Sequence, residues 1–580
     1  MEFHYSNDRA TQIVIALLKA HNIHKVIASP GTTNMALVIS MQYDPWFKMY
    51  SSVDERSAAY IACGLSAESG EPVVLSCTEA TASRNYFPGL TEAHYRKLPI
   101  LVITGTHGND LTHNLSAQSL DRSIQPKDTV NLSINVDKIH SNEEEWLVTN
   151  NVNKAILELS RHGGGPVHIN LREATGAGYS MKTLPSVRVI KRYCVDDSFP
   201  EISKYKNIVI FIGSHHEFDE KTTNAIESFC ESYNSVVIAD QTSGYHGKYK
   251  VLGALEYCQM NRTKSIHPDL LIHIGEVSGE YYATYKLQPA EVWRVSEDGE
   301  IRDLFKKITN VFEMNEFYFF NDYSTHNGKK AMTLYDRYKA NYDTLLEEIP
   351  ELPFSNIWMA QQLHEAIPEN SVIHFSIFNS LRSWNFFELP KTVKSSCNVG
   401  GFGIDGALST LIGASFANPD KLHFGIVGDL AFFYDMNSLG NRHISKNLRI
   451  MLVDNGKGTE FRNFDHPASK LGNDADRYIA AGGHYGNKSP KLVKAYTEAL
   501  GFTYLTASNK EEFLKVKDAF LCEKADRPIV LETFTNNEDE SDAIKAVRSI
   551  VKDDRTFSEK AVGKLMHIAR IAKAKVKNNL

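Results

Sequence analysis

Short apolar runs alternate with amphipathic helical stretches along almost the whole 580-residue chain. Runs such as residues 72–77, 207–213 and 423–427 have the length of a buried strand, and a helix-length stretch follows most of them. Parallel strands need a crossover connection of this kind, because they cannot be joined by a tight hairpin. The alternation therefore predicts an α/β fold built from doubly wound parallel sheets.

Polar and proline-bounded connections divide this alternation into three domains of similar size and a tail. The expected parts are a first domain over residues 1–185, a central α/β domain over 186–345, a third domain over 346–540 and a tail over 541–580. The tail carries ten Lys or Arg against four Asp or Glu, and its apolar residues recur at helical spacing. It is predicted to be a basic amphipathic helix that packs on an otherwise acidic protein, or else binds an anionic membrane surface.

Composition excludes several functional classes. The chain has 63 basic and 70 acidic residues, a formal net charge of −7, so it has no overall attraction for nucleic acid. Its apolar runs are much shorter than the roughly 18 residues that a membrane span needs, and its start lacks the pattern of a secretion signal. The seven cysteines are scattered and form no C-x-x-C pair, which indicates reduced thiols. We expect a cytoplasmic protein that acts on small molecules.

The most informative motif lies at residues 424–461. It is interpreted as a strand, a Gly-Asp turn, a helix, a second strand and an Asn-Gly loop. In a parallel βαβ unit both loops emerge at the carboxyl ends of neighbouring strands, so Asp429 and Asn455 are expected to face one crevice. Carboxylate and amide oxygens suit Mg²⁺, and glycines let backbone N–H groups approach a diphosphate. Either piece alone is more often an ordinary helix start or turn, because short motifs match by chance.

A second motif lies near the amino end, at residues 53–64. Asp54 and Glu55 stand at the start of a predicted helix of small and apolar side chains. Acidic residues in a first turn usually cap the helix or interact with its dipole. Taken alone, Glu55 is interpreted as such a residue.

Taken together and in this order, the motifs resemble the thiamine-diphosphate-dependent enzymes of the acetolactate synthase and 2-oxoacid decarboxylase group. Locally they are most similar to its MenD-like members, the synthases of succinyl-enolpyruvyl-hydroxycyclohexene carboxylate (SEPHCHC). The resemblance spans residues 8–172 and 355–535. The matching pieces include Gly428-Asp429-Leu430, Asn379-Ser380-Leu381, Gly403-Ile404-Asp405-Gly406 and Asn85. It implies that the three α/β domains are a pyrimidine-binding, a central and a diphosphate-binding domain.

The resemblance also implies an activity and cofactors. The chain would decarboxylate a 2-oxo acid with thiamine diphosphate and Mg²⁺, and pass the acyl-anion equivalent to an acceptor or release an aldehyde. Glu55, partly desolvated, would hydrogen-bond the aminopyrimidine ring and promote loss of the thiazolium proton. Ile404 would be an apolar wedge under the folded cofactor. Asp429, Asn455 and the main-chain carbonyl of Lys457 would bind the metal.

Further contacts implied by the resemblance come from both ends of the chain. The remaining cofactor contacts would be Thr78, Asn85, Asn379, Ser380, Gly428, Leu430, Gly458 and Thr459. His107 and Gln118 are candidates for proton transfer at the substrate carbonyl, although lone histidines are more often structural. The candidate substrate contacts are Thr33, Asn34, His107 and Arg382. Because this family builds its site across a subunit boundary, we expect a homodimer or a dimer of dimers.

Several positions depart from the pattern of the SEPHCHC synthases. The chain has Thr32-Thr33-Asn34, Thr106-His107, Trp384 and Val399 where arginines are expected to hold substrate carboxylates. A charge-assisted hydrogen bond contributes about 1.5–3 kcal/mol, so dicarboxylate substrates would be poorly held. SEPHCHC synthesis in a rearranged pocket and a non-catalytic scaffolding role therefore stand as alternatives. Glu79 is interpreted as a cap of the helix that follows, or as a second acidic group near the cofactor.

Overall fold

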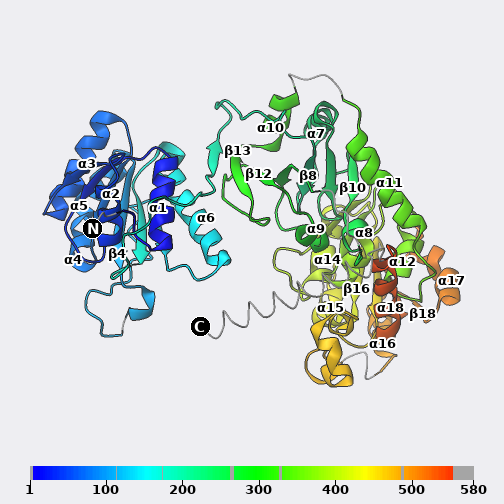
Figure 1. The fold of residues 1–580 in the computed structure, drawn as a ribbon. Helices are drawn as coiled ribbons and strands as arrows, with labels where there is room; N and C mark the ends of the chain where they lie inside the picture. Colours follow the sequence, from blue (N-terminus) through cyan, green and yellow to red (C-terminus); the bar gives the residue numbers. More distant parts are fainter. Residues whose placement is uncertain are drawn as a thin grey trace. The chain divides into compact units, whose positions relative to one another are not determined.

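The computed structural model describes residues 4–112, 114–172, 174–261, 267–324, 330–484 and 489–552. The chain forms two compact units (Figure 1): the first contains residues 1–198 and 298–313, and the second contains residues 199–297 and 314–580. The boundaries at residues 185, 345 and 540 stay a prediction. Of the predicted tail helix, residues 553–580 lie outside the described residues.

The first unit is built around a parallel six-stranded sheet with the order β2-β1-β3-β4-β6-β5. Its strands are β1 (Lys25–Ala28), β2 (Lys48–Ser51), β3 (Val73–Cys77), β4 (Ile100–Thr106), β5 (Leu132–Val136) and β6 (Val167–Arg172). Two further strands of this unit, β7 (Lys191–Tyr193) and β13 (Ile308–Glu313), pair in parallel with each other. The helices are α1 (Arg9–Ala20), α2 (Met35–Gln42), α3 (Glu55–Ser69), α4 (Ala80–Asn85), α5 (Phe87–Tyr95) and α6 (Asn142–Glu158).

Helices cover both faces of this first sheet. Successive strand residues point to opposite faces. Val74, Leu101 and Ile169 therefore pack in one core with α1, α2 and α6. Val73 and Val102 pack in a second core with α3, α4 and α5. This arrangement is a three-layer α/β sandwich, as the alternation in the sequence predicts.

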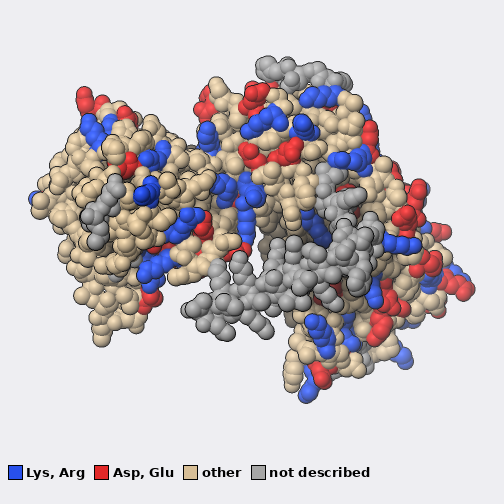
Figure 2. All heavy atoms as spheres, viewed as in Figure 1, with Lys and Arg blue, Asp and Glu red and all other residues tan. Residues whose placement is uncertain are grey.

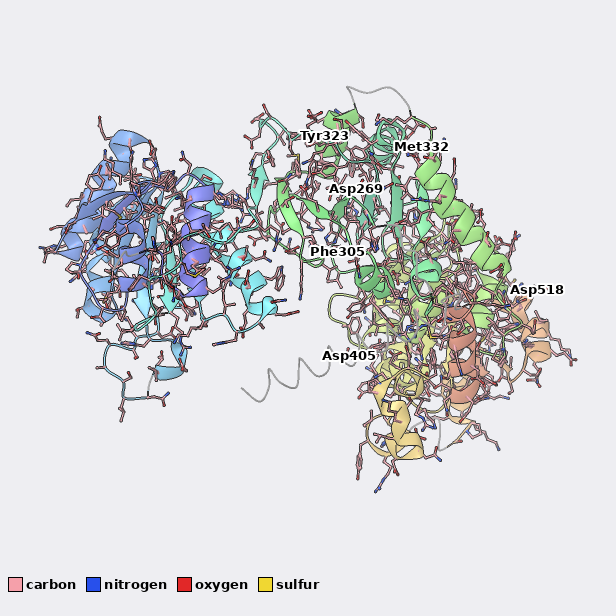
Figure 3. All side chains as sticks on the ribbon, viewed as in Figure 1. Asp269, Phe305, Tyr323, Met332, Asp405 and Asp518 are labelled. Carbon is pink, nitrogen blue, oxygen red and sulfur yellow. The ribbon has the colours of Figure 1, made fainter. Side chains whose placement is uncertain are left out.

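The second unit contains two groups of parallel strands with their helices. Figure 3 adds the side chains to the ribbon. The central group has the order β10-β9-β8-β11-β12. It contains β8 (Ile208–Ile212), β9 (Val236–Ala239), β10 (Lys250–Leu252), β11 (Leu270–Ile274), β12 (Glu291–Ser296), α7 (Glu220–Tyr233), α8 (Ala254–Tyr257), α9 (Tyr281–Lys286), α10 (Glu316–Ser324) and α11 (Thr333–Glu347).

The last sheet has the order β15-β14-β16-β17-β19-β18, and its strands are also parallel. The strands are β14 (Val372–Phe375), β15 (Lys394–Cys397), β16 (His423–Gly428), β17 (Leu448–Asp454), β18 (Thr503–Ala507) and β19 (Ile529–Phe534). The helices are α12 (Asn356–Leu363), α13 (Asn379–Trp384), α14 (Ala407–Ala417), α15 (Asp429–Asp435), α16 (Leu492–Ala499), α17 (Lys510–Leu521) and α18 (Asn537–Arg548). On one face, α14, α15 and α16 pack on β16, β17 and β19.

The first and last sheets share one strand order. In each, the second strand lies on one side of the first strand and the third strand lies on the other side. Because the connections diverge at this point, the loops after the first and third strands leave a crevice at the carboxyl edge of the sheet, where ligands of such folds bind. These loops follow β1 and β3 in the first sheet, and β14 and β16 in the last. The predicted α/β class with parallel sheets is confirmed.

Charged side chains of both signs lie on the surface of the described residues. Figure 2 shows acidic and basic side chains interspersed on the face in view. Across the described part of the chain, every helix is too short or too polar to cross a bilayer.

Candidate active site

A cavity of about 440 Å³ lies at the carboxyl ends of β14, β16 and β17 in the second unit. Its lining includes ten of the predicted site residues: Asn379, Ser380, Ile404, Gly428, Asp429, Leu430, Asn455, Lys457, Gly458 and Thr459. These residues lie on separate loops of the sequence, and the crevice at the switch point of the last sheet explains why they meet. Of the site residues predicted in the carboxyl-terminal half, only Arg382 is absent from the lining.

The loops after β16 and β17 supply two oxygen ligands to this cavity. Asp429 begins α15 and is 3% exposed, and its Oδ1 accepts the N–H of Leu430 at 2.7 Å. Burial, with a smaller contribution from the neighbouring Asp454, raises the pKa of the Asp429 carboxyl to about 7. Within the described part of the chain, the buried Oδ1 atom of Asn455 has no hydrogen-bond partner. A buried carboxylate and an unpartnered amide oxygen are a donor pair that a hard divalent cation takes.

The side chain of Lys457 is engaged elsewhere. Its ammonium lies 2.7 Å from a carboxylate oxygen of Asp476, which belongs to the 3₁₀ helix η5 (Pro467–Arg477). The main-chain carbonyl of Lys457 is therefore the group that this residue can offer to a metal. In the described ranges no cluster of three His, Cys, Asp or Glu side chains could hold a metal, so a metal here would need amide and main-chain oxygens.

Open space lies beside the backbone at Gly428. This residue has extended backbone angles, φ −77° and ψ 162°, and a Cβ built on it would meet no atom within 4 Å. The loop after β17 passes through a left-handed conformation at Gly456, with φ +81°, which glycine adopts without steric cost. An anion can thus approach the main-chain N–H groups closely, as a diphosphate requires.

Hydrogen bonds tie the cavity walls together. The amide nitrogen of Asn379 donates to the Thr459 hydroxyl at 2.6 Å, which joins the start of α13 to the loop after β17. At the end of β14, the Ser376 hydroxyl donates to the Ser380 hydroxyl at 3.2 Å. Ile404 is partly buried and packs against the core of the last sheet. These contacts hold the predicted cofactor contacts in a fixed frame.

Arg382 lies behind this wall and has internal partners. Its two terminal nitrogens pair with the Glu460 carboxylate at 2.7 and 3.0 Å. The same guanidinium donates to Asn379 Oδ1 at 3.0 Å and to the hydroxyl of Tyr281. This geometry gives Arg382 a role in holding Asn379, and its role as a substrate contact stays a prediction.

Two aromatic residues of the lining were not predicted from the sequence. Phe378 and Phe402 have positive φ values of +67° and +54°, and their rings meet edge to face at 5.0 Å. Residues other than glycine rarely adopt a positive φ, and sparsely populated backbone conformations cost of order 1–3 kcal/mol. Such strain is concentrated at binding sites, where the surroundings hold it in place. The sequence signal that was available is the position of each ring beside a motif residue, Asn379 and Gly403.

In the first unit, Glu55 is the first residue of α3 and is half-buried. The capping role falls to Asp54, whose carboxylate accepts the Ser57 N–H at 2.8 Å. Asp54 and not Glu55 is therefore the helix cap. Glu55 lies in the first turn, so its interpretation as a partner of the helix dipole stays open.

The loops after β1 and β3 contact each other. The hydroxyls of Thr33 and Thr78 lie 2.5 Å apart. The amide nitrogen of Asn34 donates to the Ser29 carbonyl at 3.1 Å and to the Ser76 hydroxyl at 3.3 Å. Thr33 and Asn34 are buried and line a cavity of only about 10 Å³. Their hydrogen bonds hold the loops after β1 and β3 together. The role of Thr33 and Asn34 as substrate contacts stays a prediction.

The remaining predicted residues of the first unit lie apart. His107 follows β4, its N–H donates to the buried Glu79, and its ring nitrogen lies 3.8 Å from the same carboxylate. Glu79 occupies the N-cap position of α4 but makes no side-chain cap hydrogen bond, so its interpretation as a cap is confirmed in position only. Asn85 and Gln118 are exposed. The structure does not gather these residues around one cavity.

Comparison with known proteins agrees with this geometry. Residues 8–127 match the family described as thiamine pyrophosphate enzyme, N-terminal TPP binding domain. The 2-succinyl-5-enolpyruvyl-6-hydroxy-3-cyclohexene-1-carboxylate synthase of Bacteroides thetaiotaomicron is 32% identical over 562 residues, which cover 93% of this chain and 98% of the relative. The corresponding synthase of Bacteroides fragilis is 31% identical over 570 residues, with the same coverage. That of Flavobacterium johnsoniae is 28% identical over 482 residues, or 79% of this chain and 85% of the relative.

This chain belongs to the thiamine pyrophosphate enzyme family. The resemblance found in the motifs is confirmed, and the cofactors of the family are thiamine diphosphate and a divalent metal. The residues present fit that pair. The orphaned Asn455 oxygen and the Asp429 carboxylate suit the metal, and the space beside Gly428 suits the diphosphate.

Proposed function

We propose that this thiamine-diphosphate enzyme decarboxylates a 2-oxo acid and transfers the acyl-anion equivalent to an acceptor, or releases it as an aldehyde. The observation that supports this is the cavity in which the Asp429 carboxylate and the unpartnered Asn455 oxygen lie beside open space at Gly428. When bound, thiamine diphosphate supplies the electron sink on which the carboxylate of a 2-oxo acid leaves as CO₂.

Residues of the second unit would bind and orient the cofactor. Asp429, Asn455 and the carbonyl of Lys457 would hold Mg²⁺, and through it the diphosphate. The hydrogen bond from Asn379 to Thr459 keeps the opposite wall in place. Ile404 would support the cofactor from below with an apolar side chain.

Glu55 would hold a proton at the ring nitrogen of the aminopyrimidine. Its carboxylate is suited to this because Asp54 caps the helix in its place. A carboxylate held within hydrogen-bond reach of a ring nitrogen acts as a general acid–base group. We further propose that Glu55 comes from the partner copy in a homodimer, with the active site at the subunit interface.

Cofactor binding tests the first part of this proposal. Titration calorimetry of the full chain with thiamine diphosphate should give saturable binding in the presence of millimolar Mg²⁺ and much weaker binding with a chelator. Asn455→Ala should weaken binding at least tenfold, because an oxygen ligand is lost. Glu55→Gln should keep binding and lose turnover. If the wild-type chain binds no thiamine diphosphate at millimolar Mg²⁺, the proposal is wrong.

A screen of 2-oxo acids for CO₂ release, with and without carbonyl acceptors, tests the reaction. The expected result is release from at least one acid, abolished in the Glu55→Gln variant. Release that persists unchanged in Glu55→Gln would contradict the role proposed for this carboxylate.

A second candidate is SEPHCHC synthesis, and full-length similarity to the Bacteroides thetaiotaomicron synthase favours it. The reaction would join 2-oxoglutarate to isochorismate. Because Arg382 is paired with Glu460 and Val399 and Trp384 are buried apolar residues, the carboxylates would need other partners. An assay with these two substrates decides between the candidates: product formation with 2-oxoglutarate and with no other 2-oxo acid would assign the synthase reaction.

A further inference from the structure

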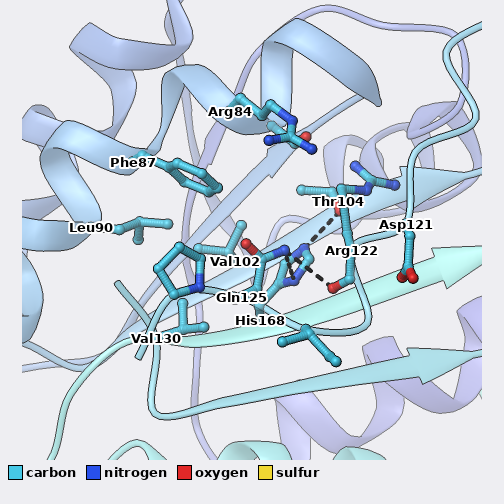
Figure 4. A pocket seen from close by; sticks show the side chains of 13 residues that line it. Arg84, Phe87, Leu90, Val102, Thr104, Asp121, Arg122, Gln125, Val130 and His168 are labelled. Atoms are coloured by element: carbon cyan, nitrogen blue, oxygen red, sulfur yellow. Dashed lines mark hydrogen bonds between the residues drawn. The ribbon is translucent and has the colours of Figure 1, made fainter. Parts of the chain in front are cut away.

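A second cavity, of about 90 Å³, lies in the first unit. Residues of α4, α5, β4 and β6 line it, together with the loop 121–126 (Figure 4). None of its lining residues lines the cavity of the second unit or belongs to the predicted site. It is therefore a separate feature of the fold.

Arg122 brings unused hydrogen-bond donors to this cavity. It is 4% exposed, and one terminal nitrogen donates to the Gly105 carbonyl at 2.7 Å. Within the described residues, its Nε and Nη1 atoms are buried and have no hydrogen-bond partner. The buried Glu79 carboxylate forms an ion pair with Arg122, with 4.0 Å between its Oε2 and Nη2. This ion pair offsets part of the charge of Arg122 but supplies no hydrogen-bond acceptor to Nε or Nη1. Buried charged donors without acceptors are costly, so this guanidinium is poised for an acceptor from outside the protein.

A second arginine lines the same cavity. Arg84 lies on α4 and is exposed. Burial lowers the pKa of the Arg122 guanidinium, the Glu79 carboxylate opposes this effect, and the charge of Arg84 contributes less in the same direction as burial. Two guanidinium groups at one cavity repel each other, and an anion between them is attracted to both. Asp121 lies at the rim, where its carboxylate accepts hydrogen bonds from the N–H and hydroxyl of Ser123.

The floor of the cavity is neutral. The ring nitrogens of His168 lie 2.8 Å from the Thr104 hydroxyl and 2.9 Å from the Ser133 hydroxyl. Burial, with the charge of Arg122, lowers the pKa of His168 to about 3, so the ring carries no charge at neutral pH. The positive charge at the cavity therefore comes from the two arginines and not from His168.

The opposite wall is apolar. Figure 4 shows Phe87, Leu90 and Val130 on the side away from the arginines. The volume of about 90 Å³ is comparable to that of about three water molecules, which limits a ligand to a short chain. The cavity thus has charged side chains at one end and apolar side chains at the other, a short distance apart.

We propose that this cavity binds a short aliphatic carboxylate. Its carboxylate lies between Arg84 and Arg122, and its hydrocarbon part packs against Phe87, Leu90 and Val130. The proposal does not rest on the reaction proposed above, because it uses no residue of that site.

Titration calorimetry of the full chain with sodium butyrate tests this proposal, with butyramide as the neutral probe of the same shape. We expect saturable binding of one butyrate per chain and no saturable binding of butyramide. Arg84→Gln should weaken butyrate binding roughly tenfold or more, because one charge-assisted bond is lost. Arg96→Gln is the matched control. This exposed arginine lies at the end of α5, outside the cavity, and its removal should leave binding unchanged.

A second variant tests the apolar wall without removing charge. Val130→Phe fills the cavity while both arginines remain, and it should abolish butyrate binding at a temperature where circular dichroism shows that the variant is folded. Equal binding of butyrate and butyramide would overturn the proposal. So would wild-type butyrate affinity in Arg84→Gln, a variant that keeps the fold because Arg84 is exposed.

Discussion

At the scale of single residues, Gly428 shows how a missing side chain shapes the main cavity. Its backbone angles are open to any L-residue, yet a Cβ there would enter free space at the cavity wall. The fold itself therefore does not require glycine at this position, and a bound diphosphate would be the reason for it. Phe378 is the reverse case, because its backbone favours glycine and the chain keeps an aromatic ring there.

Gly428→Ala should therefore separate folding from cofactor binding. We expect the thermal stability to stay within about 1 kcal/mol of wild type, because alanine tolerates this conformation. The affinity for thiamine diphosphate at fixed Mg²⁺ should fall at least tenfold, since the methyl group occupies diphosphate space. Gly440→Ala is the matched control: this glycine also faces open space but lies at the end of η3 (Met436–Gly440), away from the cavity. Equal affinities of the two variants would show that the diphosphate does not bind at Gly428.

His168 should make the first unit sensitive to acid. Its pKa falls from 6.5 to about 3 on folding, so between these values the unfolded chain binds more protons than the folded one. The free energy of unfolding then decreases as pH falls, by about 2 kcal/mol between pH 6.5 and pH 5. Hydrogen exchange of the β4 and β6 amides, corrected for intrinsic rates, measures this slope. The slope should flatten in His168→Gln and not in His140→Gln, which changes an exposed histidine. A wild-type slope in His168→Gln would contradict the assignment.

At the scale of elements, strongly patterned segments could be predicted and featureless ones could not. From the sequence alone, the helical period of polar and apolar residues predicts a helix over residues 220–233, and these are the bounds of α7. The pattern of residues 83–95 predicts one helix, and the structure has two, α4 and α5, with the break at Tyr86. Pro88 has no N–H to donate to the carbonyl four residues earlier, so a continuous helix would lack a hydrogen bond there, whereas proline is tolerated in the first turn of α5. α2 was missed because its apolar residues surround the whole helix and carry no period.

The same distinction holds for the site. Asp429 and Asn455 could be placed together from the sequence, because a parallel βαβ unit fixes where its loops emerge. The pairing of Arg382 with Glu460 could not be predicted, since it joins residues that are far apart in the chain. The positive φ of Phe378 could not be predicted either, because the residue is not glycine and its sequence neighbours do not indicate such a conformation.

The start of α3 gives a prediction at this scale. Asp54→Ala removes the carboxylate that accepts the Ser57 N–H, so the first turn should fray and Glu55 should lose its position. We expect kcat to fall severalfold while thiamine diphosphate affinity, set by the second unit, stays near wild type. Asp54→Asn keeps a capping oxygen and should restore most of the rate. If alanine and asparagine have equal effects, capping is not the cause.

At the scale of the whole molecule, the predicted chemistry is divided between two sheets of the same strand order. The metal and diphosphate residues lie at the mouth of the last sheet, and Glu55 belongs to the first unit. If Glu55 acts on a cofactor held by the partner copy, each active site takes one half from each chain.

Hybrid dimers test this division. Chains with Glu55→Gln and chains with Asp429→Asn should each be inactive as homodimers. A purified hybrid of the two has one site with both changes and one site with neither, so it should regain about half of the wild-type rate. The measurement is CO₂ release by the doubly tagged hybrid. Hybrids as inactive as their parents would place both groups of a site in one chain.

The shared strand order of the first and last sheets also bears on how such a protein can change over time. Each sheet has its own hydrophobic core, and each ends in its own set of loops at the switch point. If the loops of the first sheet contact the substrate, as predicted, a substitution there would alter which acid is accepted while the residues around Asp429 keep their own supporting core. The two sets of loops would then be free to change independently of each other.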